Sequence, residues 1–147
     1  MRTRSRAGWL LALLPAVALA DTAGTNFQVG ATVVPRTSVA PVGAPAQVQV
    51  TARDLALGYV DVAATYRVAS NDPRGYLLKF ATRTGLTRTI DVGGLAAPLT
   101  LSDAGAEVHQ AVGTGAHDVA LRYRLHLAPQ AREGVYPLPV LVVARSL

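Results

Sequence analysis

The residues of this chain that could carry chemistry are few and widely spaced. Cysteine is absent, so there is neither a thiol nucleophile nor a thiolate ligand. The histidines are His109, His117 and His126, and Glu107 and Asp118 lie next to the first two as further metal-ligand types. Their spacing matches no common ligand pattern, and the glycine-rich sequence around them is typical of exposed loops. We predict no metal site.

Catalytic side chains are equally hard to find. General acid–base catalysis uses paired carboxylates in a cleft, whereas the aspartates of this chain fall in predicted turns or on exposed strand faces. The chain contains no Gly-x-Ser-x-Gly nucleophile motif, and its glycine pairs are not followed by a helix that could bind phosphate. We therefore predict that the protein is not an enzyme and uses no cofactor.

The first twenty residues have the pattern of a secretory signal peptide. Arg2, Arg4 and Arg6 precede an apolar stretch from Trp9 to Ala20, which ends in the small-residue sequence Ala18-Leu19-Ala20. A bilayer span takes about 20 apolar residues, and this stretch is shorter. We predict cleavage after Ala20, export to the periplasm or cell surface, and no membrane insertion after the signal is removed. An uncleaved anchor is the alternative.

Removal of this segment changes the charge balance. Three of the 14 Lys and Arg residues lie within it and all nine Asp and Glu residues lie beyond it, so the net charge falls from +5 to +2. This small charge, with no concentrated basic face, argues against a nucleic-acid partner. Residues 21–147 are enough for a single domain, which without disulfides must be held together by core burial.

Apolar and polar residues alternate along almost the whole of residues 21–147. This two-residue period predicts β-strands, which would have to position any site. In the clearest strand, 119–127, apolar Val, Leu and Tyr occupy the odd positions, and three of the four even positions carry Arg or His. Further strands are predicted over 25–34, 46–51, 60–68, 76–81, 86–92, 99–101, 107–110 and 135–144, with a proline- and glycine-rich loop after Pro35 and a possible helical turn within 53–58. Short strands separated by turns predict an all-β fold, an antiparallel β-sandwich of about seven strands.

The last predicted strand carries two prolines, Pro137 and Pro139. Alternate residues of a strand direct their N–H groups to the same neighbour, so both prolines remove donors from one side only. We expect an edge or a register break near residues 137–139. The other side, served by Tyr136, Leu138 and Val140, can pair fully.

Two segments carry a resemblance to a known family. Phe27-Gln28-Val29-Gly30-Ala31-Thr32-Val33-Val34, just after the signal, resembles the opening of spore coat protein U-type domains, the subunits of archaic chaperone–usher pili and related secreted proteins. Arg132-Glu133-Gly134-Val135-Tyr136, followed by an apolar strand, looks like the closing Gly-x-Tyr segment of that family. Its members usually have a disulfide, with cysteines near 36–38 and 68–70 of this chain, and an aromatic residue near the end. This chain has neither, and so resembles a divergent, cysteine-free branch.

The resemblance implies an incomplete immunoglobulin-like sandwich. In that family the missing strand is supplied first by a periplasmic chaperone and then by the opening strand of a neighbouring subunit, a form of β-augmentation. The implied donor residues are Phe27, Val29, Ala31 and Val33, and the implied acceptor groove is lined by Tyr136, Leu138, Val140 and Val142. The protein would then be a non-catalytic exported structural protein, a pilus (fimbrial) subunit that interacts through strand donation.

Two alternatives remain open at this point. Residues 25–34 could pair within their own chain instead of in a neighbour. The domain could also be a self-contained periplasmic binding module, which recognises a protein or a small ligand through the loops at one end of the sandwich.

Overall fold

The computed structural model describes residues 30–83, 85–111 and 113–147. The predicted signal peptide, 1–20, and two of the predicted donor residues, Phe27 and Val29, lie outside these ranges. Residues Val33–Leu147 form one compact unit. Within the described ranges, no helix is both long enough and apolar enough to cross a membrane.

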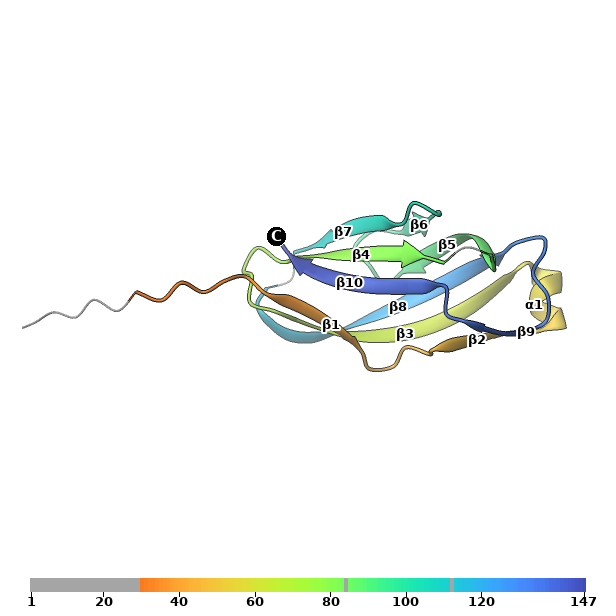
Figure 1. Cartoon of the computed structure of the whole chain (residues 1–147), viewed down its shortest axis with the longest axis horizontal. Coiled ribbons are helices and arrows are strands. Elements are labelled where there is room, and N and C mark those ends of the chain that lie inside the picture. The colour runs from red at the N-terminus through yellow and green to blue at the C-terminus, as the bar shows by residue number, and fades with distance from the viewer. Residues whose placement is uncertain (1–29, 84, 112) are drawn as a thin grey trace, which may run out of the picture. The chain divides into compact units, whose positions relative to one another are not determined.

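The described residues form ten strands and one short helix (Figure 1). In chain order they are β1 (Thr37–Pro41), β2 (Gln47–Val50), α1 (Ala52–Leu57), β3 (Tyr59–Ser70), β4 (Tyr76–Thr82), β5 (Thr87–Gly93), β6 (Leu99–Leu101), β7 (Ala106–Gln110), β8 (Gly115–Leu127), β9 (Gly134–Pro137) and β10 (Val140–Ser146). The predicted all-β class is confirmed, although there are ten strands where about seven were expected.

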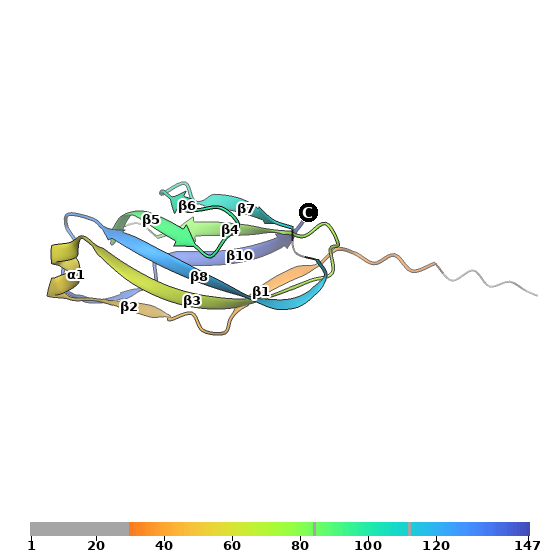
Figure 2. The same cartoon turned by 180° about the vertical axis from the view of Figure 1, so that it is seen from behind.

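The strands form three antiparallel sheets. A five-stranded sheet has the order β1-β3-β8-β5-β6, a three-stranded sheet has the order β10-β4-β7, and β2 pairs with β9. The two larger sheets lie face to face as the layers of a sandwich, and the β2–β9 ribbon lies at the end that carries α1 (Figures 1 and 2). The longest ladder, between β3 and β8, runs from Tyr59↔His126 to Ser70↔Gly115.

The core lies between these two layers, and β8 shows why. Leu121, Tyr123 and Leu125 are almost fully buried, whereas Arg122 and Arg124 are exposed on the opposite face. A slip of one residue would expose the apolar set and bury both guanidinium groups, so the register of this strand is strongly determined. The three-stranded layer contributes Tyr76, Leu78, Phe80, Val140 and Val142 to the same core.

The predicted helical turn is confirmed as α1, and its ends have local causes. Thr51 and Asp54 form a capping box, in which each side chain bonds the backbone N–H of the other. At the other end Gly58 adopts a left-handed conformation with φ of 81°, which glycine adopts without steric cost.

The chain before β2 differs from the expectation. Residues 30–36 have no regular structure, so the predicted strand 25–34 is wrong for its described part, which includes the donor residues Ala31 and Val33. The first described strand is instead β1, inside the predicted loop. Its sequence has little alternation, and it is a strand because β3 pairs with it from Thr37↔Ser70 to Pro41↔Tyr66.

The predicted strand 135–144 is interrupted at its prolines, which confirms the expected register break. The β9 segment pairs with β2 up to Gln47↔Pro137, and the N–H of Leu138 then donates to Ala46. After Pro139 the chain joins the other layer, where β10 pairs with β4. The prolines thus mark the point at which this chain segment changes its partner.

The core makes a first prediction. Replacing buried Leu125 by alanine should lower the free energy of unfolding by about 2–5 kcal/mol, because the methyl groups lose their contacts and leave a cavity. Urea denaturation of the purified protein measures this loss. Leu57, exposed at the end of α1, is the matched control, and Leu57→Ala should change the same free energy by less than about 0.5 kcal/mol. Equal losses in both variants would contradict the described core.

Candidate functional site

The histidines considered in the sequence are separated by the fold. Each Nε2 atom has its own partner: the carbonyl of Arg74 for His109 at 3.1 Å, the hydroxyl of Tyr76 for His117 at 2.8 Å, and the carboxylate of Asp91 for His126 at 2.8 Å. Among the residues that the structure describes, no group of three His, Asp or Glu could hold a metal ion. These side chains therefore make pairwise contacts within the sandwich.

A hollow of about 540 Å³ lies on the outer face of the five-stranded sheet. Arg124 donates to both carboxylate oxygens of Asp61, at 2.8 and 2.9 Å, and thereby lowers the pKa of that carboxyl. Asp91 accepts bonds from His126 and Thr100, and these bonds lower its pKa as well. The carboxylates of this hollow are thus already bonded to side chains of the same sheet. At such exposed positions ion pairs contribute little to the stability of the fold.

A second hollow, about 290 Å³, lies where β1 and β10 face each other. It is mainly apolar and is lined by Val39, Pro41, Ala44, Pro45, Ala46, Tyr66, Arg83, Pro137, Leu138, Val140, Leu141 and Val142. Three of the four predicted acceptor residues, Leu138, Val140 and Val142, are brought together here. The fourth, Tyr136, lies in β9 opposite Val48 of β2 and donates its hydroxyl proton to the carbonyl of Arg132. We call this hollow and the two strand edges beside it the β1–β10 groove.

The backbone of β10 has hydrogen-bonding groups on its groove side. The N–H of Arg83 donates to the carbonyl of Pro139 at 2.9 Å, which makes these two residues a hydrogen-bonded pair. Bonded and non-bonded pairs alternate along an antiparallel ladder, so the odd-numbered residues 141–145 direct their peptide groups to β4. The even-numbered residues 140–144 direct theirs toward β1, and no described strand pairs with them. The predicted full pairing beyond Leu138 is therefore not found.

The opposite wall of the groove, strand β1, also has backbone groups that point into the groove. The N–H of Asn71 donates to the carbonyl of Arg36 at 3.1 Å, so the even-numbered residues of β1 face β3. Thr37 and Val39 consequently direct their N–H and C=O groups toward β10, and Pro41, which has no N–H, directs only its carbonyl there. The groove thus has two strand edges that are unpaired within the described part of the chain, above the apolar side chains of the core.

Both ends of the groove are closed. At the α1 end the β2–β9 ladder crosses it, starting with the bond from Leu138 to Ala46. At the other end the Thr37 hydroxyl lies 2.9 Å from that of Ser70 and 3.1 Å from that of Ser146, which joins β1 to β10 through side chains. The open part of the β10 edge therefore covers residues 140–145.

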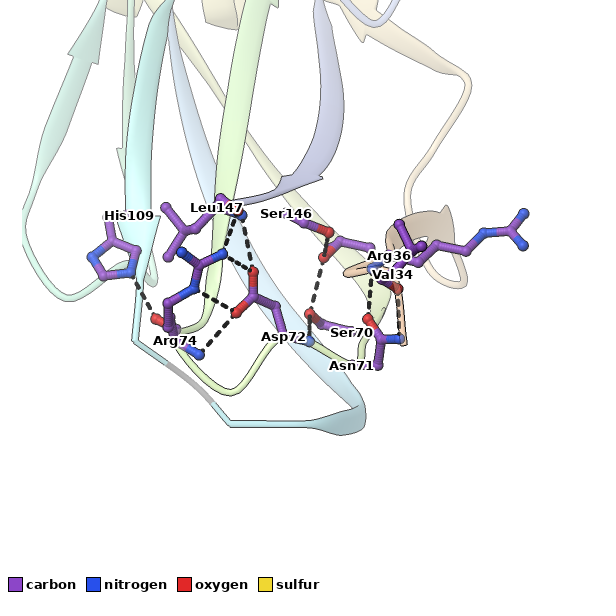
Figure 3. Close-up of polar contacts among 10 residues, drawn as sticks. Val34, Arg36, Ser70, Asn71, Asp72, Arg74, His109, Ser146 and Leu147 are labelled. Atoms are coloured by element: carbon purple, nitrogen blue, oxygen red, sulfur yellow. Dashed lines mark hydrogen bonds and ion pairs between the residues drawn. The ribbon is translucent and has the colours of Figure 1, made fainter. Parts of the chain in front are cut away.

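The turn between β3 and β4 holds this second end (Figure 3). The buried Asp72 carboxylate accepts bonds from the backbone and guanidinium N–H groups of Arg74 at 2.9–3.1 Å, and from the N–H of Leu147 at 3.3 Å. Arg74 in turn donates to the carbonyl of Leu147. Asn71 bonds the chain just before β1. We call Asn71, Asp72 and Arg74 the terminal clamp, because they bind the chain before β1 and after β10.

Two features distinguish this turn, a glycine that its backbone requires and a carboxyl with a lowered pKa. The predicted turn over 70–75 is confirmed, and it ends at Gly75, where φ is 99° and an added Cβ would lie 2.1 Å from the carbonyl oxygen of Gln110. Only glycine fits there. Within the turn, hydrogen bonding from Arg74 lowers the pKa of Asp72 from its usual 3.8 to about 2, against the opposing effect of burial.

Comparisons with models of protein families, with curated proteins and with solved structures find no match to this chain. The groove and the terminal clamp are therefore the structural features that bear on the function. Sequence reasoning missed the clamp. The turn residues Asn71-Asp72-Pro73 were recognisable, but nothing local indicated that the aspartate would be buried and bonded to Leu147, 75 residues away.

The clamp predicts an acid-sensitive contribution to stability. Because the pKa of Asp72 is lower in the folded state than the usual 3.8, its contribution is complete above about pH 4 and is lost as the pH falls toward 2. Asp72→Asn should lower Tm at pH 7 by about 5 °C or more, since a charge-assisted network is broken. It should also make the loss of Tm below pH 4 shallower than in the unmodified protein.

Thermal melts from pH 2 to pH 7 measure both effects. The other carboxyls with a lowered pKa are the same in both proteins, so the difference between the two curves isolates Asp72. Asp103→Asn, in the exposed turn between β6 and β7, is the matched control and should leave Tm at pH 7 unchanged. An Asp72→Asn curve parallel to that of the unmodified protein would contradict the role of the clamp.

Proposed function

We propose that this protein is a non-catalytic, exported assembly module of the kind found in pilus subunits, and that its β1–β10 groove accepts a β-strand from another chain. The observation that carries this proposal is the edge of β10 that no described strand pairs with, beside the apolar hollow that Val140 and Val142 line. An incoming strand would bond the peptide groups of Val140, Val142 and Ala144 and place alternate side chains in the apolar hollow. This is the physics of β-augmentation.

The order of the strands supports the proposal. The order β1-β3-β8-β5 corresponds to A-B-E-D of a constant-type immunoglobulin sheet, and β10-β4 corresponds to F-C of the opposite sheet. In such a domain strand G pairs with the free side of strand F. Here that side is the groove edge of β10, where no described strand pairs, which supports strand acceptance at this edge.

The segment before β1 has the pattern that a donor strand needs. Phe27, Val29, Ala31 and Val33 alternate with Gln28, Gly30 and Thr32, and the seven positions from 27 to 33 are close in number to the open positions 140–145. Val33 is 73 % exposed in the described chain. Burying a valine or phenylalanine side chain stabilises a complex by about 1.5–3 kcal/mol, and main-chain bonds add to this.

The groove edge of β10 also indicates which partners the protein would have. Neighbouring subunits would supply residues 25–34, and before assembly a periplasmic chaperone would cover the groove with a strand of its own. An open strand edge is prone to non-specific pairing, which is why such a cover is needed. A self-contained binding module is the alternative, and it would leave the groove empty in every assembly state.

A synthetic peptide of residues 25–34 tests this function. At saturation it should raise Tm of the purified protein by several degrees, because it binds the folded state only. Hydrogen exchange should slow at the backbone N–H groups of Val140, Val142 and Ala144, since these groups gain partners. Residues 141 and 143, already bonded to β4, should change less.

The matched controls are two versions of the same peptide, one N-methylated on its odd-numbered residues and the other on its even-numbered residues. Each version blocks the hydrogen-bond donors along one edge of the peptide strand. N-methylation keeps the side chains and removes main-chain donors, so at least one version should bind tenfold or more weakly. Slower exchange only outside the groove, or equal binding of all the peptides, would rule out strand acceptance and favour the binding-module alternative.

A further inference from the structure

We propose that a hollow at the α1 end of the sandwich binds a small carboxylate that carries an apolar group, with Arg88 as the residue that holds the carboxylate. This hollow, of about 370 Å³, lies between α1 and the loop that joins β8 to β9 (Figure 1). It shares no lining residue with the β1–β10 groove, so the inference goes beyond strand acceptance and does not depend on it.

Main-chain hydrogen bonds hold the walls of this hollow together. The N–H of Leu127 donates to the carbonyl of Gly58 at the end of α1, at 2.9 Å. The N–H of Ala128 donates to the carbonyl of Leu86, also at 2.9 Å, and a bond from Ala131 to Ala128 closes the turn after β8. The hollow is therefore formed before a ligand arrives, which lowers the cost of binding. All of its lining side chains except Arg88 are apolar or absent: Leu55, Gly58, Leu127, Ala128, Pro129 and Ala131.

An extra residue in β5 keeps Arg88 out of the core. Thr89 lies opposite His126 of β8, so a regular ladder would place Arg88 opposite Leu127. Residues opposite each other in a ladder point to the same side of the sheet, and Leu127 is buried in the core. The register shifts between Thr87 and Thr89, however, and Thr87 takes the place opposite Leu127. Arg88 is thus a bulged residue, whose exposed side chain lines the hollow.

The charges around the hollow leave Arg88 able to bind an anion. In the described part of the chain it forms no ion pair, and neither do Arg53 of α1 and Arg132 of the loop after β8. The carboxylate of Asp54 is held within the capping box. Glu133 is then the remaining carboxylate of α1 and this loop. Three arginines beside one such carboxylate give this end of the sandwich a positive potential.

A carboxylate with an apolar group fits this arrangement better than a phosphate does. The guanidinium of Arg88 has a planar pair of N–H donors that matches the two oxygens of a carboxylate. Arg88 is the one arginine that lines the hollow, and it balances a single negative charge. A phosphate monoester would bring further charge next to apolar walls, which costs desolvation. The apolar part of the ligand would contact Leu55 and Pro129.

NMR titration of the isotope-labelled protein with hexanoate tests the inference. Hexanoate should shift the backbone signals of Gly58, Ala128 and Ala131, and the shifts should saturate. Acetate lacks the apolar chain and hexan-1-ol lacks the charge, so each should bind roughly tenfold or more weakly than hexanoate. Hexyl phosphate should also bind more weakly than hexanoate.

Variants of Arg88 separate its charge from the shape of its donor group. Arg88→Gln should weaken hexanoate binding roughly tenfold or more and leave hexan-1-ol binding unchanged, because only the ion pair is removed. Arg88→Lys keeps the charge without the planar fork and should give an intermediate affinity. Arg122→Gln is the matched control, since Arg122 is another exposed arginine of the same sheet, and it should bind hexanoate as the unmodified protein does. Thermal melts check that each variant is folded.

The possible results are distinct. Saturable shifts at the hollow that weaken in Arg88→Gln and persist in Arg122→Gln support the inference. Shifts only elsewhere, shifts that do not saturate, or equal weakening in both variants would overturn it. Tighter binding of hexyl phosphate than of hexanoate would overturn the assignment of a carboxylate. None of these results bears on strand acceptance, which the peptide of residues 25–34 tests separately.

Discussion

The arrangement of this domain depends on one unsatisfied pairing. Strands β1 and β10 belong to opposite layers and face each other over the core, yet within the described chain neither pairs with the other. Their peptide groups can bond water, so an open edge is tolerable, and the core side chains beneath it, Val140 and Val142, are already buried. The same edge thus leaves main-chain groups that no described strand pairs with.

The terminal clamp shows how the rest of the sandwich tolerates this opening. Without a ladder between β1 and β10, the two layers need another connection at that end. The turn after β3 supplies it, with Asn71 bonded to the chain before β1, and Asp72 and Arg74 bonded to Leu147. A buried carboxylate with several donors is stable only when all of these partners are present, so the turn connects the two ends closely.

Much of the fold was predictable because alternation is a local property. The strands around Leu121 and Tyr66, the break at Pro137 and Pro139, and the helical turn after Thr51 all follow from neighbouring residues. The prediction failed for β1, whose Thr37-Ser38-Val39 sequence has weak alternation, and for residues 30–34, whose strong alternation is not used within the described chain. A strand forms only where a partner is placed beside it, and that placement is a long-range property.

The sequence by itself determined which side of each strand is buried, where proline interrupts pairing, and that Leu138, Val140 and Val142 share one side of the final segment. Only the tertiary structure decided which strand lies opposite them, that Asp72 is buried, and that Asn71 holds Val34. The physical reason is separation along the chain. Side-chain direction is set by the two-residue repeat of the backbone, whereas the groove and the clamp bring together residues up to 109 positions apart.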